Sequence, residues 1–197
     1  APTSTSKANL LKENICPEQI LVTGNTVIDA LQTTVKEGYR FEDEEFNKVF
    51  ASGHRLILMT THRRENLGEP MRHVYRALKS VLEAHPDVEA IFPVHKNPKV
   101  REIVREELGH LDRVHLIEPM EYEPFANLMA KVDIVLTDSG GIQEEAPALG
   151  KPVLVLRDTT ERPEAVEAGT VKLVGTAYDD VPVSYTHLRA HETDSYL

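Results

Sequence analysis

The fold is decided by the stretch Val132-Asp-Ile-Val-Leu-Thr-Asp-Ser-Gly-Gly-Ile-Gln-Glu-Glu-Ala146. Its beginning, residues 132–136, is a short apolar run rich in β-branched side chains, which is typical of a buried strand. Residues 142–149 have a helical pattern that ends at Gly150. The stretch therefore predicts a strand that turns directly into a helix through Ser139-Gly140-Gly141.

The turn Ser139-Gly140-Gly141 has the properties of a phosphate-binding site. Free backbone N–H groups and the positive end of the helix dipole attract anions there, and paired glycines let a diphosphate approach without meeting a Cβ. Glu145 follows about one turn into the helix, where a carboxylate can accept hydrogen bonds from the vicinal hydroxyls of a sugar. A tight connection without a ligand is the structural alternative. The serine and the spaced glutamate favour a nucleotide.

Length and composition limit the possible classes of protein. The 197 residues are enough for one full core and part of another. No run approaches the roughly 20 apolar residues of a membrane helix, and no signal-peptide pattern is present, so we expect a cytoplasmic protein without a membrane partner. The single cysteine, Cys16, excludes an internal disulfide and a cysteine-based metal site. The net charge of −10 argues against nucleic-acid binding.

Strand and helix patterns alternate along the chain. Strands are expected at residues 19–23, 55–61, 88–94, 114–117, 132–136, 152–156 and 171–174. Helices are expected at residues 26–37, 41–50, 69–85, 98–108, 121–131 and 142–149. Strands separated by helices of this length imply a parallel sheet with right-handed crossovers and helices on both faces. The sequence therefore predicts an α/β, Rossmann-like fold.

Polar clusters follow the expected strands, at residues 62–66, 95–98, 118–122 and 157–164. Ligands of such sheets bind beyond the carboxyl ends of the strands, so these clusters should face one crevice. The candidates are arginines, which bind phosphate or carboxylate, and histidines, which donate hydrogen bonds or carry protons. Each one alone is better explained as a helix cap or a surface ion pair, but four clusters together favour a site. The candidate side chains are Arg63, Arg64, Arg157, Arg162, His62 and His95.

Four ordered motifs and one connecting segment carry a family resemblance. They are Thr61-His-Arg-Arg-Glu-Asn66, Pro93-Val-His-Lys-Asn-Pro98, Thr137-Asp-Ser-Gly-Gly-Ile-Gln-Glu-Glu-Ala146, Arg157-Asp-Thr-Thr-Glu-Arg-Pro-Glu-Ala165 and the connection Val22-Thr-Gly-Asn-Thr-Val-Ile-Asp29. Together they resemble the non-hydrolysing UDP-N-acetylglucosamine 2-epimerases over residues 1–176. The resemblance implies the C-terminal domain of a GT-B architecture, in which two Rossmann-like domains enclose the nucleotide sugar. It also implies interconversion of UDP-N-acetylglucosamine and UDP-N-acetylmannosamine for polysaccharide biosynthesis.

The resemblance assigns residues to the parts of UDP. Ser139-Gly140-Gly141 would hold the diphosphate and Glu145 the ribose hydroxyls. Phe125 would lie by the uracil, and the backbone near Met120 would read its edge. Some relatives have glutamine at the position of Met120, so the resemblance does not extend to that side chain. Arg162 would reach the phosphate side of the cleft.

At the reacting end, the resemblance implies a catalytic role for His62 near the β-phosphate and the sugar. Arg63 and His95 match the regulatory contacts of a second UDP-N-acetylglucosamine in some relatives. The chemistry is elimination of UDP across C1–C2 and its re-addition, which requires a carboxylate base but no metal and no cofactor. His62 can neutralise the leaving group or donate a proton, and the sequence does not choose between these roles. Members of the family are usually homodimers.

The resemblance also predicts a fragment truncated at both ends. Residues 1–28 would be a remnant of the N-terminal domain with the connection, residues 29–182 the UDP-binding domain, and residues 183–197 a non-native, disordered tail. His187 and His191 lie in that tail with the spacing of a helical metal pair, but no third ligand is evident. The catalytic carboxylates would belong to the missing N-terminal domain. We therefore expect weak UDP binding and no epimerisation by the 197-residue chain.

Two alternatives share part of this pattern. A hydrolysing relative, which releases N-acetylmannosamine and UDP, has the same nucleotide half; the segments 62–66 and 157–165 favour the non-hydrolysing branch. A GT-B glycosyltransferase or a non-catalytic nucleotide-sugar sensor also places glycines and a glutamate near the nucleotide. The full set of four motifs argues against that second alternative.

Overall fold

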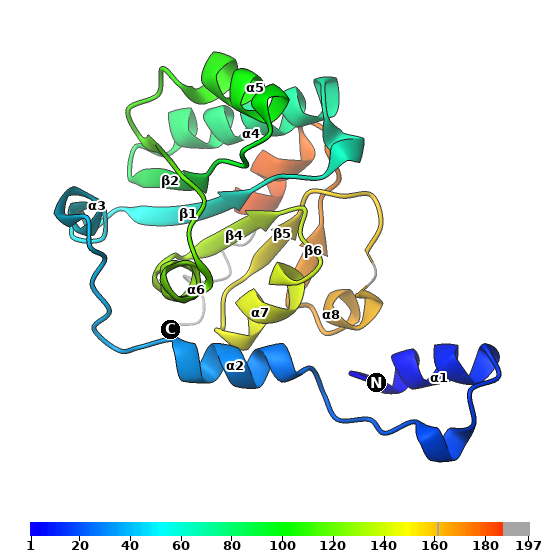
Figure 1. The fold of residues 1–197 in the computed structure, drawn as a ribbon. Helices are drawn as coiled ribbons and strands as arrows, with labels where there is room; N and C mark the ends of the chain where they lie inside the picture. The colour runs from blue at the N-terminus through cyan, green and yellow to red at the C-terminus, as the bar shows by residue number, and fades with distance from the viewer. Residues whose placement is uncertain (161, 187–197) are drawn as a thin grey trace, which may run out of the picture.

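The computed structural model describes residues 1–160 and 162–186 and contains a parallel sheet in the strand order β3-β2-β1-β4-β5-β6 (Figure 1). All pairings are parallel, as the sequence predicts. β1 pairs with β2 on one side and with β4 on the other, so the strand order reverses between β1 and β4. The strands are β1 (Arg55–Thr60), β2 (Val88–Pro93), β3 (Val114–Ile117), β4 (Ile134–Thr137), β5 (Val153–Val155) and β6 (Val171–Leu173).

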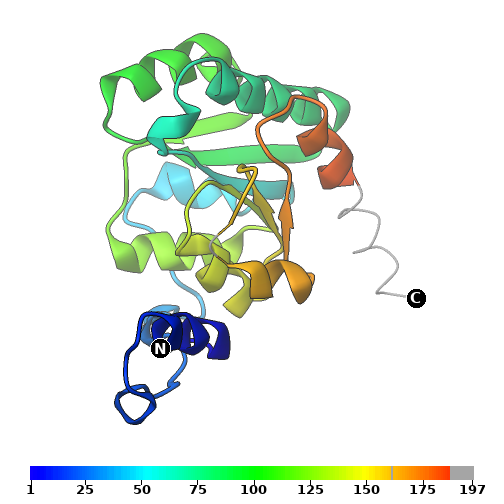
Figure 2. The same ribbon diagram turned by 90° about the vertical axis from the view of Figure 1, so that its right-hand side faces the viewer.

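Helices cover both faces of this sheet, which confirms the predicted layers (Figures 1 and 2). α4 (Glu69–Ala84) and α5 (Pro98–Leu108) pack on one face, and α2 (Thr26–Thr34), α3 (Glu44–Val49), α6 (Tyr122–Lys131) and α7 (Ile142–Ala148) on the other. The apolar stripe predicted for α4 is buried against the sheet. It consists of Met71, Val74, Leu78, Val81 and Leu82.

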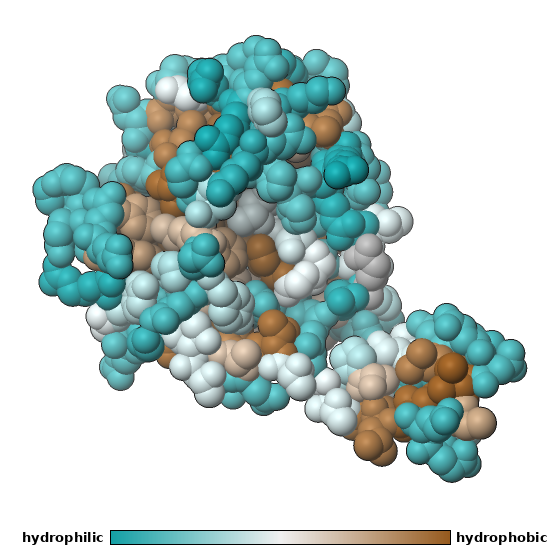
Figure 3. Space-filling view, in the orientation of Figure 1, coloured by the Kyte–Doolittle hydropathy of each residue, from teal (hydrophilic) through white to brown (hydrophobic). Residues whose placement is uncertain are grey.

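Shorter elements complete the described chain. They are α1 (Ser4–Lys12), α8 (Pro163–Glu167) and two 3₁₀ turns, η1 (Pro17–Gln19) and η2 (Arg64–Asn66). α1 lies below and to one side of the sheet, and apolar surface is visible over this N-terminal segment in Figure 3. Among the described residues, no helix has both the length and the apolar character that crossing a membrane requires.

The strand predicted at residues 19–23 is wrong. The η1 turn ends at Gln19, and residues 20–25 form neither strand nor helix. Ile20 is buried, but Leu21 is 73% and Val22 50% exposed. An apolar run becomes a strand only where a neighbouring strand accepts its hydrogen bonds, and no strand in the described part of the chain pairs with this segment.

Residues 183–186, which belong to the segment expected as a tail, lie within the described part of the chain. Residues 180–186 are helical, and Val181, Ser184 and Tyr185 are buried on the α4 side of the sheet. The ring of Tyr185 lies 5.4 Å from that of His85. Val181 and Tyr185 are four residues apart and therefore share one helical face, a pattern too short to recognise in the sequence. His187 and His191, the candidate metal pair, lie outside the described residues.

A buried carboxylate joins three elements at the amino end of the sheet, far from the strand ends that carry the polar motifs. Glu89 in β2 accepts from His54 Nδ1 at 2.6 Å and from His115 Nε2 at 2.5 Å. Burial opposes the charged form of Glu89, but the hydrogen bonds from His115 and His54 outweigh it and lower the pKa of the carboxyl. Because the folded-state pKa is lowered, the stabilisation is present above the unfolded value of about 4.3 and is lost as the pH falls through the folded value.

We expect Glu89→Gln to lower the free energy of unfolding by about 1–3 kcal/mol at pH 6, because the charge-assisted bonds to two histidines are lost. The deficit should shrink as the pH falls below the unfolded value of about 4.3, and it should disappear below the lowered folded pKa, where wild-type Glu89 is itself protonated. Urea unfolding between pH 3 and 7 measures both effects. Glu83→Gln is the control, because Glu83 is exposed and 3.9 Å from Lys79. Equal stability of Glu89→Gln and wild type at pH 6 would contradict the argument.

Candidate functional site

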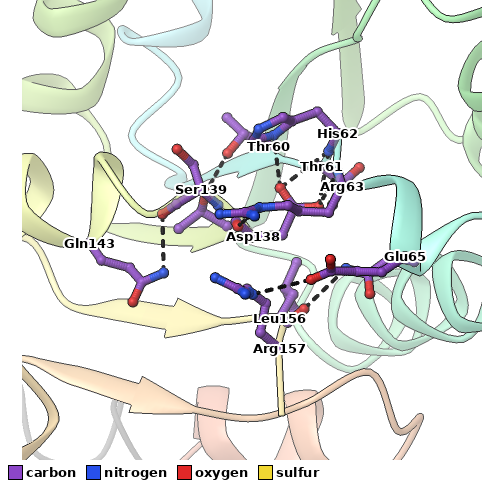
Figure 4. A network of polar contacts seen from close by, with 12 residues as sticks. Thr60, Thr61, His62, Arg63, Glu65, Asp138, Ser139, Gln143, Leu156 and Arg157 are labelled. Atoms are coloured by element: carbon purple, nitrogen blue, oxygen red, sulfur yellow. Dashed lines mark hydrogen bonds and ion pairs between the residues drawn. The ribbon is translucent and has the colours of Figure 1, made fainter. Parts of the chain in front are cut away.

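The polar motifs meet where the strand order reverses, at the carboxyl ends of β1 and β4 (Figure 4). Thr60 lies opposite Thr137 in the pairing, and their hydroxyls are 2.6 Å apart. The backbone N–H of Asp138 donates to the carbonyl of Thr60 at 3.3 Å, and that of Ser139 donates to Thr137 Oγ1 at 2.9 Å. These contacts place the segment after β1 directly beside the turn after β4, as expected for ligand sites in open parallel sheets.

Asp138 is the buried centre of this junction. Its carboxylate accepts from the backbone N–H of His62 at 3.0 Å and of Arg63 at 2.9 Å, and it lies 2.8 Å from His62 Nδ1. Burial opposes ionisation of Asp138, but the hydrogen bonds from His62 and Arg63 outweigh it and lower the pKa. The hydrogen bond to Asp138 raises the pKa of His62, which favours its charged form.

The three residues expected at the reacting and regulatory positions lie together. The His62 and His95 rings have centroids 6.2 Å apart, and Arg63 Nε donates to the carbonyl of Asp138 at 3.3 Å. His62 is 43% exposed at its side chain, so it is accessible from the crevice. Within residues 1–160 and 162–186, no group of three or more His, Cys, Asp or Glu side chains has a metal-binding arrangement.

The loop Ser139-Gly140-Gly141 leads into α7 with its last glycine exposed. Gly141 caps the helix without a side chain, and outside its own chain neighbours and helix backbone no heavy atom of the described residues lies within 4 Å of the place where a Cβ would stand. Gln143, which is fully buried, donates from Nε2 to the carbonyl of Ser139 at 3.2 Å and accepts from the Thr160 hydroxyl at 2.5 Å. Gln143 thus fixes the loop relative to the segment after β5.

Glu145 lies on the α6 side of α7. It is only 8% exposed, and no hydrogen bond to its side chain comes from the described residues. Burial raises its pKa, with a smaller contribution from the charge of Glu144. Burial and the charge of Glu145 raise the pKa of Tyr122, which places this carboxylate near the start of α6. Met120 and Phe125 are half-buried and pack against the same core as α7.

Arg162 lies on another side of α7. Its guanidinium forms an ion pair with Glu144, which also accepts from Asn25 Nδ2 at 2.5 Å. The backbone N–H of Arg162 donates to the Thr160 hydroxyl at 3.0 Å. A cavity of about 400 Å³ lies between these residues and the N-terminal segment, lined by Arg162, Gln143, Glu144, Thr3, Ser6 and Pro147, among others.

Two arginines named as candidates from the sequence, Arg157 and Arg64, remain. Arg157 Nε lies 3.4 Å from Glu65, and Asn66 donates to the carbonyl of Leu156 at 3.3 Å, so that the segments after β1 and β5 are joined (Figure 4). Arg64 is exposed in η2. The roles of Asp138 and Gln143 were not predicted from the sequence. Their only signal is a polar residue inside a motif whose other members are glycines and strand residues.

A doubly wound parallel sheet with a glycine loop and convergent polar side chains at its switch point defines a Rossmann-like α/β protein, a class whose ligands bind at this point of the sheet. The family model described as UDP-N-acetylglucosamine 2-epimerase matches residues 1–196. The chain therefore belongs to the UDP-N-acetylglucosamine 2-epimerase family, which confirms the resemblance read from the motifs.

Curated relatives agree. The UDP-N-acetylglucosamine 2-epimerase of Bacillus subtilis (strain 168) is 55% identical over 181 residues, which cover 92% of this chain and 47% of that protein. That of Escherichia coli (strain K12) is 48% identical over 200 residues, which cover 98% of this chain and 53% of that protein. The chain thus spans about half the length of the curated relatives it matches.

Solved structures show the same fold. The UDP-GlcNAc 2-epimerase from Neisseria meningitidis bound to UDP-GlcNAc superposes with a TM-score of 0.87 at 46% identity, over 98% of this chain and 53% of that one. The S. aureus MnaA–UDP co-structure gives a TM-score of 0.88 at 46% identity, over 95% of this chain and 49% of that one. The predicted Rossmann-like domain of a GT-B architecture is confirmed by these neighbours.

Proposed function

We propose that this chain is the UDP-binding half of an enzyme that interconverts UDP-N-acetylglucosamine and UDP-N-acetylmannosamine without net hydrolysis. The observation that carries the proposal is the junction of β1 and β4, which places His62 beside the Ser139-Gly140-Gly141 loop. Related structures carry UDP-GlcNAc or UDP by their descriptions, and the family match supports the same ligand here.

In this proposal the loop amides and Arg162 hold the diphosphate, because anions are stabilised by free N–H groups and guanidinium. Arg162 must exchange part of its ion pair with Glu144 for the ligand. The buried carboxylate of Glu145 accepts hydrogen bonds from the ribose hydroxyls. These hydroxyls provide the hydrogen-bond donors that the described residues do not provide. Phe125 packs on the uracil, and the backbone near Met120 binds its edge.

His62 stands at the end of the diphosphate where the C1–O bond breaks. As an imidazolium it neutralises charge that develops on the departing UDP, and the glycal that remains is protonated at C2 when UDP adds back. The C2 base must be a free carboxylate. Asp138, the carboxylate that contacts His62, is already engaged by His62 and Arg63, and Glu145 is assigned to the ribose. The family resemblance assigns the base to a carboxylate of the N-terminal domain, so we expect no turnover by the 197-residue chain.

Further parts of the proposal come from the family resemblance. These are a cytoplasmic location, a homodimer of the whole protein, and regulation by a second UDP-N-acetylglucosamine at Arg63 and His95. The short distance between the His62 and His95 rings, 6.2 Å, supports communication between that regulatory position and the reacting end.

Calorimetric titration with UDP, UMP and CDP tests the nucleotide assignment. We expect UDP to bind at least about ten-fold more tightly than UMP, because the second phosphate adds charge-assisted hydrogen bonds. CDP should bind more weakly than UDP if the edge of uracil is read. Equal affinity for UDP and UMP would remove the diphosphate site, and a coupled assay showing robust epimerisation by the chain alone would remove the assignment of the base.

A further inference from the structure

The His62 side chain is held by a single buried group. Asp138 has no exposed surface, and one of its oxygens lies 2.8 Å from His62 Nδ1. The backbone N–H groups of His62 and Arg63 fix the same carboxylate. A carboxylate with these donors cannot rotate away from the imidazole, so both the position and the orientation of the ring are determined by Asp138.

This arrangement decides which ring nitrogen faces the ligand. A carboxylate only accepts, so Nδ1 of His62 must carry a proton to bind Asp138. Nε2 lies on the opposite side of the ring, and within residues 1–160 and 162–186 it has no hydrogen-bond partner. When His62 is charged, Nε2–H is therefore a donor available to an anionic oxygen beside the Ser139-Gly140-Gly141 loop.

We propose that Asp138 is a positioning residue, which holds His62 with its proton on Nδ1 and presents Nε2–H to the diphosphate. The inference rests on the proposed function, because it requires an anion at the loop. Such pairs of carboxylate and histidine fix the tautomer and favour the charged ring in other sites.

The other groups around the ring do not replace Asp138. The Arg63 charge lowers the pKa of His62, and His95 lies 6.2 Å away between ring centroids. Tyr75 of α4 shares a 2.7 Å hydrogen bond with Thr61, the residue before His62, but burial raises the pKa of Tyr75 and keeps it neutral. Asp138 is thus the one anion in contact with His62 among the described residues.

The test uses the 197-residue chain with ¹⁵N-labelled histidine and the variant Asp138→Asn. Long-range ¹H–¹⁵N spectra report the tautomer and the pKa of His62. We expect the pKa of His62 in the wild type to lie above 6.5 and the neutral ring to carry its proton on Nδ1. In the variant the pKa should be 6.5 or below, and the neutral ring should be a mixture of both tautomers. UDP affinity at pH 7 should fall about ten-fold in the variant, and affinity should decline at a lower pH than in wild type.

Asp133→Asn is the matched control. Asp133 also accepts from a backbone N–H, that of Leu56 at 2.7 Å, but at the amino end of the sheet. Asp133 is exposed, so Asp133→Asn should lose less stability than Asp138→Asn, and the His62 titration and UDP affinity should stay unchanged. If Asp138→Asn does not fold, wild-type spectra still decide: a neutral His62 with its proton on Nε2 overturns the inference.

The outcomes separate the two claims. Unchanged His62 titration in Asp138→Asn, with UDP bound normally by wild type, overturns the inference and leaves the proposed function intact. A lowered His62 pKa without any change in UDP affinity across the pH range also overturns it. Absence of UDP binding to wild type overturns the proposed function, and with it the role of the pair toward the ligand.

Discussion

Replacing Glu145 by glutamine should weaken UDP binding by about 100-fold and, at the same time, stabilise the folded chain. The two effects have one cause. Glu145 is a buried carboxylate that no described side chain pairs with, so its charge is costly in the protein and useful only to a ligand with two adjacent hydroxyls. Hydrogen bonds to a charged group contribute about 1.5–3 kcal/mol each, so weakening two of them gives the expected loss.

The stability effect has a defined pH dependence. Burial raises the pKa of Glu145 in the folded chain, so the folded state binds its proton more tightly than the unfolded state does. Stability is therefore lost as the pH rises from the unfolded value of about 4.3 through the folded value, and the loss is complete above it. Glu145→Gln carries no charge and avoids this loss.

Two measurements test Glu145→Gln. Urea unfolding at pH 4 and pH 8 should show the variant more stable than wild type at pH 8, with a smaller difference at pH 4. Calorimetry should show that Glu145→Gln weakens the binding of UDP about 100-fold. The same substitution should weaken the binding of 2′,3′-dideoxy-UDP, which lacks the ribose hydroxyls, much less. An equal loss for both nucleotides would mean that Glu145 does not bind the ribose. Glu83→Gln serves as the control, because Glu83 is an exposed carboxylate of α4 that contacts none of the proposed site residues.

Gly141→Leu should reduce UDP affinity by at least about 100-fold without destabilising the fold. Gly141 has φ −66° and ψ −44°, a conformation open to any residue, and no heavy atom lies within 4 Å of its ideal Cβ. The protein therefore has room for a side chain, and only a bound diphosphate would compete with it. Displacing two charge-assisted amide contacts accounts for the magnitude.

Gly109→Ala is the opposite case and completes the comparison. A Cβ there would stand 2.6 Å from the carbonyl of Arg105, so the variant should melt at a lower temperature but bind UDP as wild type does. Thermal unfolding by circular dichroism and UDP titration of both variants give four results. Normal UDP binding by a folded Gly141→Leu would place the diphosphate elsewhere.

The fold was largely predictable because its main elements have strong local patterns. Every observed strand from β1 to β6 coincides with an apolar run expected as a strand, and α4 buries the predicted stripe. The error at residues 19–23 arose because a strand requires a partner that the local sequence does not specify. Helix α8 and residues 180–186 were missed because elements of one or two turns are set by tertiary packing.

The site was predictable as a set of segments but not as a geometry. Parallel strands share one edge for their carboxyl ends, which is why His62 and the Ser139 loop were expected together. Asp138 contacts His62 and Arg63, which lie 76 and 75 positions earlier in the chain. These contacts depend on β1 and β4 being neighbours in the sheet, which the local sequence does not specify. The sequence pattern of Gln143 is that of an ordinary helix residue, because its role depends on its contacts with Ser139 and Thr160.

The residues proposed for the site divide into two groups, one leading into α4 and α5 on one face of the sheet and one in or before α6 and α7 on the other face. His62, Arg63 and His95 follow β1 and β2, whereas Met120, Phe125 and Glu145 belong to the segments around α6 and α7. Under the proposed function, the residues that bind the nucleoside and the residues that act on the C1–O bond are thus carried by helices and loops on opposite faces of the sheet. Substitutions around α6 can therefore change which nucleobase is bound, while the residues after β1 and β2 keep their arrangement.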